Sequence, residues 1–326
     1  MLLVSQAPIE PPPCAEPIVI GLVNNMPDAA LRTTERQFHD LLSAASQNRV
    51  VRIRHFSLPE LVRAPAAQSH ISRHYEDLGE LWPSRLDGLI VTGTEPRAAA
   101  LEDEPYWGTL TRLVDWAAER SISTVWSCLA AHAAVLHLDN IERRRLPRKL
   151  SGVFVSVKAR RDEMVADAPF QWSLPHSRYN GLIEQDLVSR GYRILYHSPA
   201  TGADVFVKDE ASLNIFIQGH PEYEADTLLR EHRRDVGRFL AGGISEYPEV
   251  PSGYFSDDAI AALSAFRQQT LRHRDIGLLR AFPTAALERG LSSPWRLPAV
   301  RLYENWMSYL ADHKTSAREH LDRSSQ

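Results

Sequence analysis

Short apolar runs alternate with helix-like stretches between Ile18 and Leu240, and this alternation restricts the fold more than any other feature of the chain. The β-branched run 18–23 indicates a strand, and the stretch 29–45 indicates a helix because its apolar residues fall on one face. Alternating strands and helices are typical of a sheet whose parallel strands are joined by crossover helices. The sequence therefore predicts a doubly wound α/β domain with a mostly parallel sheet.

The same patterns predict the remaining elements of this domain. We expect further strands at 50–56, 89–91, 122–126, 153–157, 192–196, 205–207 and 213–217, and further helices at 106–119, 129–138 and 225–240. The segment 59–83 is polar and rich in histidine, and we expect it to be irregular.

Two segments flank the α/β pattern, which we assign to a main domain at 18–244. Residues 1–17 hold four prolines between positions 8 and 13. Because proline fits neither a helix interior nor a central strand, we expect a disordered leader there. The chain after Gly242 is punctuated by prolines and then predicts helices at 258–274 and 305–310. We therefore expect residues 245–326 to form a mainly helical extension packed on the main domain.

Charge and cysteine content exclude several classes of function. The chain has 37 lysine and arginine residues against 41 aspartate and glutamate residues, so no overall positive field attracts nucleic acid. Its two cysteines, Cys14 and Cys128, are too few for a secreted disulfide scaffold and indicate a cytoplasmic protein. No apolar run reaches the roughly 18 residues that span a membrane, and we expect no membrane association.

Cys128 is the first candidate for chemistry, because it lies between a predicted strand and a predicted helix. A side chain on such a turn stands at the carboxyl edge of the sheet, where ligands of α/β proteins bind. The helix amino terminus adds free N–H groups and a positive dipole end, which favour a thiolate and help to hold an oxyanion. This placement suits a nucleophile. The alternative is a small buried residue of the core, since free cysteine is among the most buried residue types.

His220 and Glu222 form the second candidate pair. They follow a predicted strand, and the proline between them favours an extended backbone at His220. Side chains two residues apart in extended chain point the same way, so the carboxylate can orient the imidazole. Together with Cys128 they would make a Cys-His-Glu triad. The alternative is that the pair only caps the helix that follows.

Motifs along the chain resemble a known family. Cys128 after a strand, with His-Pro-Glu about ninety residues later, resembles the class I glutamine amidotransferase-like fold, a flavodoxin-like doubly wound sheet. Longer motifs are similar, in order and spacing, to homoserine O-acyltransferases of the homoserine O-succinyltransferase (MetA) type. These are GLIVTG at 88–93, YW at 106–107, ST at 123–124, KLSGV at 149–153, PHSRY at 175–179, GHPEY at 219–223, VPSGYF at 250–255 and NW at 305–306.

The resemblance implies a ping-pong acyl transfer in methionine biosynthesis. Acyl-CoA would be a co-substrate, with succinyl favoured over acetyl, and no cofactor would stay bound. Cys128 would carry the acyl group as a thioester, His220 would act as general base and Glu222 would orient it. The resemblance also implies a homodimer.

Three further positions match substrate-contacting residues of the family: Lys149, Ser177 and Arg234. An arginine grips a carboxylate with two parallel hydrogen bonds, and a serine hydroxyl positions a polar group, which suits an amino acid acceptor. Without the family context, Lys149 and Arg234 read as solvated surface charges.

The sequence departs from the family at two places. Arg97 aligns with a selectivity position that holds glycine in succinyl users and glutamate in acetyl users. Its cation could pair with the distal carboxylate of succinyl-CoA, its bulk could shorten the pocket to acetyl size, or it could face solvent. The segment 25–32 lacks the family's paired lysines. L-Serine therefore stays an alternative acceptor, because one methylene discriminates only about 10 to 200-fold.

Other readings remain open. A glutamine amidotransferase-like hydrolase would use the same triad, but the usual Gly-x-Cys-x-Gly turn is replaced by WSCLA at 126–130. A non-catalytic paralogue would not need all three triad residues. Basic residues at 143–145, 148 and 160–161 could bind CoA phosphates or simply face solvent. His70 and His74 have helical metal-ligand spacing, with Glu76 nearby, but no further ligand is evident and we expect no metal.

Overall fold

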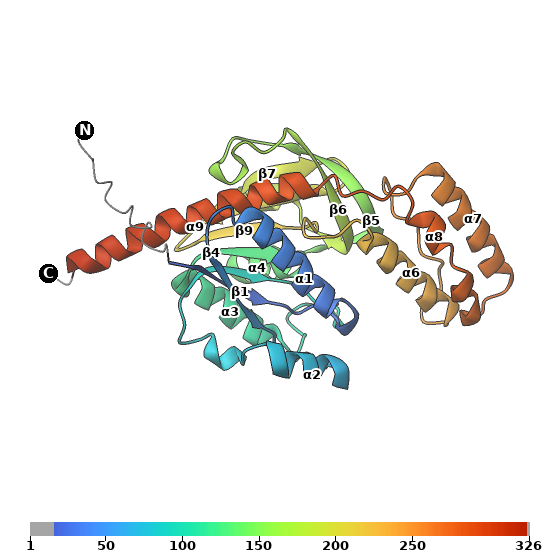
Figure 1. Ribbon diagram of the computed structural model, residues 1–326, viewed down its shortest axis with the longest axis horizontal. Helices are drawn as coiled ribbons and strands as arrows, with labels where there is room; N and C mark the ends of the chain where they lie inside the picture. Colours follow the sequence, from blue (N-terminus) through green and yellow to red (C-terminus); the bar gives the residue numbers. More distant parts are fainter. Residues whose placement is uncertain (1–15, 325–326) are drawn as a thin grey trace, which may run out of the picture.

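The computed structural model describes residues 16–324, so almost all of the expected leader lies outside the described residues (Figure 1). A sheet of nine strands forms its centre, in the order β2-β1-β3-β4-β9-β8-β7-β5-β6. The first five in that order are parallel: β2 (Val51–Phe56), β1 (Ile18–Val23), β3 (Leu86–Val91), β4 (Ser121–Ser127) and β9 (Leu213–Ile217). The other four pair antiparallel: β8 (Gly202–Asp209), β7 (Arg193–Ser198), β5 (Arg144–Lys158) and β6 (Gln171–Gly181).

The predicted doubly wound α/β class is confirmed, with a sheet that is mixed. Helices cover both faces, as apolar strands require. α3 (Trp107–Arg120) and α4 (Leu129–Asp139) bury their apolar residues in a core on one face. α1 (Asp28–Ala45) and α9 (Arg296–Ser324) build the core on the other face.

Several elements differ from the sequence prediction. The segment predicted to be irregular contains α2 (Pro65–His74) and a 3₁₀ turn, η1 (Leu78–Glu80), so that prediction was wrong. Proline at the first turn of α2 is compatible with a helix, because the N–H it lacks would have no intrahelical partner. β6, α5 (Glu184–Ser189) and a short turn, η2 (Glu163–Val165), were not predicted. β5 begins at Arg144, well before the expected strand, because residues 144–145 and 150–157 pair with β6, with a register shift between the two stretches.

The C-terminal region divides into two parts. α7 (Asp257–Arg272), η3 (Ile276–Ala281) and α8 (Thr284–Leu287) share a small apolar core with α6 (Thr227–Leu240), and Figure 1 shows them as a lobe beside α6. α9 instead runs back across the main sheet (Figure 1).

The packing of α9 shows that it belongs to the main core. A Cβ at Gly88 of β3 would lie 2.8 Å from side-chain atoms of both Trp306 and Leu310. The Trp306 indole also donates a hydrogen bond of 2.9 Å to Ser123 Oγ of β4. The short helix expected at 305–310 is therefore the buried middle of a much longer one. None of the helices within residues 16–324 is both long and apolar enough to cross a membrane.

Candidate active site

The nucleophile candidate sits on a strained turn. Cys128 joins the end of β4 to the start of α4 with φ 54° and ψ −113°, a left-handed region that residues other than glycine rarely adopt. Such backbone strain costs about 1–3 kcal/mol and persists where the surrounding structure enforces it. Here the Cys128 N–H donates a 2.7 Å hydrogen bond to the Ile217 carbonyl at the end of β9. The turn therefore holds Cys128 at the carboxyl edge of the sheet, as predicted.

Gly93 brings a third strand end against this turn. A Cβ at Gly93 would lie 2.5 Å from Leu129 Cβ and 2.9 Å from the Leu129 backbone nitrogen. Only glycine lets the chain after β3 approach the first residue of α4 so closely. Close packing against the residue after Cys128 therefore explains the glycine at position 93 of the TG pair.

His220 and Glu222 lie together in a buried position beside Cys128. His220 Nδ1 is 2.9 Å from Glu222 Oε1, and the imidazole stacks on the Tyr223 ring at 4.3 Å between centroids. Burial lowers the pKa of His220, but its electrostatic and hydrogen-bond interactions with Cys128 and Glu222 outweigh this and raise that pKa well above the ordinary value. This imidazole therefore binds a proton firmly while facing the thiol.

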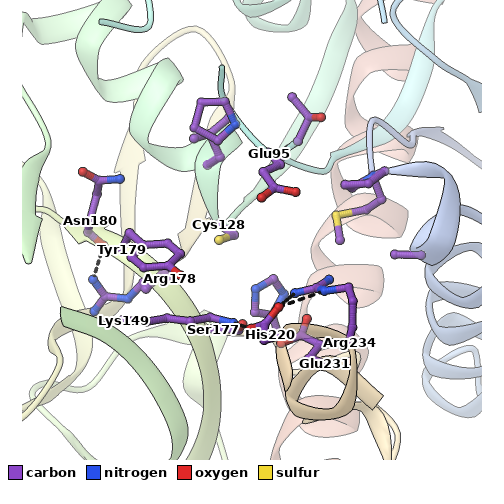
Figure 2. Close-up of a pocket in the computed structure, with 18 of the residues that line it drawn as sticks. Glu95, Cys128, Lys149, Ser177, Arg178, Tyr179, Asn180, His220, Glu231 and Arg234 are labelled. Atoms are coloured by element: carbon purple, nitrogen blue, oxygen red, sulfur yellow. Dashed lines mark hydrogen bonds and ion pairs between the residues drawn. The ribbon is translucent and has the colours of Figure 1, made fainter. Parts of the chain in front are cut away.

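A cavity of about 330 Å³ opens at Cys128 (Figure 2). Its ionisable lining carries two more positive than negative side chains when the histidines are counted as neutral. The cationic side chains are Arg145, Lys149, Arg178, Arg234 and Arg238, and the carboxylates are Glu95, Glu231 and Asp235. A cavity with this balance attracts an anionic substrate group.

The structure brings together most of the predicted site residues. Cys128, His220, Lys149, Ser177 and Arg234 all line the cavity, and Figure 2 shows them converging from different elements. Glu222 lies behind the imidazole, with its side chain almost completely buried.

Arg97 is placed elsewhere. It lines a neighbouring cavity of about 500 Å³, which shares Pro27 and the residues 94–96 with the cavity at Cys128. Its backbone N–H donates to the buried Glu104 carboxylate at 2.5 Å, and the Ala98 N–H does so at 2.6 Å. Glu104 thereby fixes the loop that separates the two cavities.

Sequence reasoning missed Asp235, which joins two of the predicted residues. Asp235 Oδ2 accepts a 2.7 Å hydrogen bond from Lys149 Nζ, and its Oδ1 accepts one of 3.1 Å from Arg234 Nε. Burial raises the pKa of Asp235, but the two cations outweigh it and hold that pKa below the ordinary value. The adjacent pair Arg234-Asp235 was the available signal, but the contact with Lys149 spans 86 residues.

Two further carboxylates at the cavity were also missed. Glu95 pairs with the Arg238 guanidinium through two contacts of 3.1 Å. Glu231 accepts a 2.8 Å hydrogen bond from the Tyr223 hydroxyl, while its other oxygen, Oε2, has no hydrogen-bond partner among the described residues. That oxygen is buried, so Glu231 contributes its negative charge to the cavity rather than an exposed acceptor atom.

The remaining candidates have ordinary partners. His70 Nε2 lies 2.8 Å from Glu35 Oε2, and within residues 16–324 no group of three or more histidine, cysteine or acidic side chains is arranged to hold a metal. Among the basic residues considered for CoA phosphates, Arg145 lies over the Tyr179 ring at the cavity and Arg148 pairs with Glu249.

Comparison with known proteins identifies the family. The sequence profile described as homoserine O-succinyltransferase matches residues 14–317. The chain belongs to the homoserine O-succinyltransferase family. A relative named homoserine O-succinyltransferase from Rhodopseudomonas palustris is 50% identical over 297 residues, which are 91% of this chain and 89% of that protein. Relatives of the same name from Bradyrhizobium japonicum and Methylorubrum extorquens are 47% and 44% identical, over 90% and 93% of this chain and 90% of each of those proteins.

Solved structures share the fold at much lower identity. A glutamine amidotransferase from Methylobacillus flagellatus matches with a TM-score of 0.50 and 16% identity, over 90% of this chain and 94% of that one. A glutamine amidotransferase from Thermotoga maritima matches with a TM-score of 0.50 and 12% identity, over 90% and 99%. These likenesses confirm the predicted glutamine amidotransferase-like fold of this chain.

Proposed function

We propose that this chain transfers a succinyl group from succinyl-CoA to the side-chain hydroxyl of L-homoserine, in methionine biosynthesis, through a thioester on Cys128. Membership of the family and the shared name of its relatives support the reaction. The observation that carries the mechanism is the strained turn at Cys128 beside the buried His220–Glu222 pair, at the wall of a positively charged cavity.

In the first half-reaction, the Cys128 thiolate attacks the thioester carbonyl of the donor. The carbon–sulfur bond to CoA then breaks, and the proton held by His220 passes to the departing CoA thiolate. Cys128 keeps the acyl group, and His220 is left neutral. N–H groups at the start of α4 are suitable donors to the oxyanion that forms on the carbonyl.

In the second half-reaction, the homoserine hydroxyl gives its proton to His220 and attacks the acyl-cysteine carbonyl. The bond from the carbonyl carbon to Cys128 Sγ breaks, which releases O-succinylhomoserine and restores the thiolate beside a protonated imidazole. Glu222 holds the imidazole orientation in both halves. In both half-reactions, the bond that is exchanged is the one to the carbonyl carbon of the acyl group. Donor and acceptor can therefore occupy the same small cavity in turn.

The ionisable lining fits an α-amino acid. Lys149 and Arg234, both held by Asp235, would bind the homoserine carboxylate, and the negative charge of Glu231 at the cavity would attract its ammonium group. Ser177 would contact a polar substrate group. Arg97 would tune donor choice from the neighbouring cavity, which the acyl chain of a donor would reach by passing residues 94–96.

We further propose that residues 18–244 form the catalytic domain and 245–326 a helical extension packed on it. The enzyme would act as a cytoplasmic homodimer on small molecules, with no nucleic acid or membrane partner. Acyl-CoA would visit only as a co-substrate, and no metal or cofactor would stay bound.

The decisive experiment is intact-protein mass spectrometry after brief incubation with succinyl-CoA or acetyl-CoA, each without acceptor. Peptide mapping locates the adduct on Cys128 rather than Cys14, and the Cys128→Ala variant serves as the control. A chase with homoserine or serine then shows which amino acid removes the acyl group. Adducts from succinyl-CoA that homoserine clears support the proposal. Acyl transfer retained in Cys128→Ala contradicts the thioester mechanism, and the absence of labelling by either donor makes glutamine hydrolysis the next activity to assay.

A further inference from the structure

Gln218 connects the elements that carry the nucleophile and the base. It directly follows β9 and precedes Gly219-His220, and its side chain is completely buried. Its amide Nε2 donates a 2.5 Å hydrogen bond to the Ala203 carbonyl of β8. Its Oε1 accepts a 3.2 Å hydrogen bond from the Leu182 N–H and lies 2.8 Å from His132 Nε2 of α4.

These contacts define the donor and acceptor at every atom of the network. The Ala203 carbonyl can only accept, so the Gln218 NH₂ group must face it and Oε1 must face His132. His132 Nε2 must then carry the proton that it donates to Oε1. Burial lowers the pKa of His132 to about 3, so the ring is neutral near pH 7 and its Nδ1 holds a lone pair. Nδ1 is buried and has no hydrogen-bond partner among the described residues.

His132 stands one helical turn after Cys128. Its backbone nitrogen lies 3.4 Å from the Cys128 carbonyl oxygen, and the residue lines the active-site cavity. The His132–Gln218 hydrogen bond and the backbone bond from Cys128 N to Ile217 O both tie the start of α4 to the end of β9.

The base is held from the other side of the same segment. The His220 N–H donates a 2.8 Å hydrogen bond to the Pro175 carbonyl of β6. A Cβ at Gly219 would lie 2.6 Å from the Leu174 side chain and 2.9 Å from the Pro175 oxygen, so β6 packs directly against this residue. Because Gln218 is bonded to α4 and the adjacent Gly219-His220 contacts β6, a shift of Gln218 would move His220 relative to Cys128.

We propose that His132 and Gln218 form a positioning pair that sets the geometry between Cys128 and His220. The pair acts through the two reacting residues and not on substrate. This inference rests on the proposed function only in taking Cys128 as the nucleophile. Displacing reacting groups by about 1 Å lowers rates by up to about 100-fold.

The test measures alkylation of Cys128 by iodoacetamide against pH in the full chain, with peptide mapping to separate Cys128 from Cys14. This reaction reports on the nucleophile without any acyl donor. The variants are His132→Leu and Gln218→Met, which lose the link, and His132→Gln, whose amide can still donate to Gln218 Oε1. A matched control is Asn214→Leu, which removes a buried amide of β9, the strand that precedes Gln218; this amide accepts a 2.8 Å hydrogen bond from Trp126 Nε1.

We expect His132→Leu and Gln218→Met to slow alkylation at pH 7 by about 10 to 100-fold and to shift its pH profile. His132→Gln should recover most of the rate, and Asn214→Leu should keep the wild-type profile. Wild-type rates and profiles in both disrupting variants would overturn the inference, as would an equal effect in Asn214→Leu. If one disrupting variant fails to fold, the other decides the matter, because His132→Leu and Gln218→Met each remove the link from a different side. A wild-type rate and pH profile in the variant that folds also overturns the inference.

Parallel incubation with succinyl-CoA separates this inference from the proposed function. Loss of alkylation in the variants, with no acyl labelling of the wild-type protein, would sink the acyl-transfer mechanism and leave the positioning pair standing. Normal acyl labelling of the wild-type protein, with unaltered alkylation and acylation in the variants, would support the acyl-transfer mechanism and overturn the positioning pair.

Discussion

At the scale of single residues, the site combines a strained nucleophile with charges that are already paired. Cys128 has a positive φ, and His220 lies between the thiol and Glu222. Lys149 and Arg234 share one carboxylate, that of Asp235, before any substrate arrives. Side chains that are already held by ion pairs need no large rearrangement when substrate binds. The role of each pair can be tested by a separate substitution.

Glu222→Gln should shift the pH dependence of catalysis. Glu222 is one of the groups that raise the pKa of His220, so its neutral replacement lowers that pKa and the imidazole loses its proton at lower pH. Because the first half-reaction needs the protonated imidazole, we expect the alkaline limb of kcat/KM for acyl-CoA to move to lower pH. A pH–rate profile measures the shift, and an unmoved alkaline limb would show that Glu222 does not set the protonation of His220.

Asp235→Asn should weaken binding of the amino acid. The amide has no charge to hold Lys149 and Arg234 in place, so the KM for homoserine should rise by about 10-fold or more, in line with the loss of a charged hydrogen bond. The rate of Cys128 acylation without acceptor should stay near the wild-type rate. Asp226→Asn, at an exposed pair with Arg230, is the control and should leave KM unchanged. Equal KM values in all three proteins would contradict the assignment.

Arg97→Glu should lower the preference for succinyl-CoA over acetyl-CoA. The substitution replaces a cation with an anion in the cavity that adjoins the one at Cys128, which disfavours a donor with a distal carboxylate. We expect the ratio of the two kcat/KM values to fall by about 10-fold, with Arg97→Gly in between. The backbone bond from residue 97 to Glu104 survives both changes. An unchanged ratio would show that the acyl chain does not reach this cavity.

At the scale of elements, the site depends on helices that pack on opposite faces of the sheet. α4, which begins directly after Cys128 and contains His132, packs on one face, whereas α9 buries Trp306 and Leu310 against β3 on the other. β3 and β4 therefore lie between the two packing layers, and their carboxyl ends meet at Gly93 and Cys128. The distant C-terminal helix thus supports the strands that hold the nucleophile.

Trp306→Ala should destabilise the whole domain, because α9 is part of the main core. Large-to-small changes of a fully buried tryptophan lower the free energy of unfolding by about 3–5 kcal/mol. Trp306→Phe keeps most of the ring but loses the bond to Ser123 Oγ, so its loss should be smaller. Urea denaturation measures both. A loss under about 1 kcal/mol in Trp306→Ala would show that the helix is dispensable for the main core.

At the scale of the whole molecule, buried neutral histidines couple folding to pH. His232 of α6 lies beside Phe282 of the C-terminal lobe, at 6.3 Å between ring centroids. Burial lowers its pKa to about 4, although nearby Asp235 opposes the shift. At pH values between the ordinary histidine pKa of about 6.5 and this lowered pKa, His232 is protonated in the unfolded chain but neutral in the folded chain. Stability is therefore lost as the pH falls through this range.

His232→Gln should make the protein less sensitive to acid. A shift from about 6.5 to about 4 corresponds to roughly 3 kcal/mol of stability lost by pH 4, and the variant lacks this contribution. The free energy of unfolding at pH 7 and pH 4.5, measured by urea denaturation, should fall less in the variant than in the wild type. Equal losses in both proteins would show that His232 titrates normally in the fold.

The sequence by itself determined the features that local pattern controls. The alternation of strands and helices predicted the doubly wound class because side-chain periodicity reports local conformation directly. It also placed Cys128 on a strand–turn–helix junction and aligned His220 with Glu222, two residues apart. In each case the residues that define the feature are neighbours in the chain.

Only the tertiary structure decided the contacts between distant segments. Local patterns did not predict the helix α2, the strand β6 or the full length of α9. These features depend on packing partners that lie elsewhere in the chain. Asp235 meets Lys149, and Gln218 meets His132, across 86 residues in each case. Such pairs depend on where the sheet brings strand ends and helices together, because burial and hydrogen bonding act through space rather than along the chain.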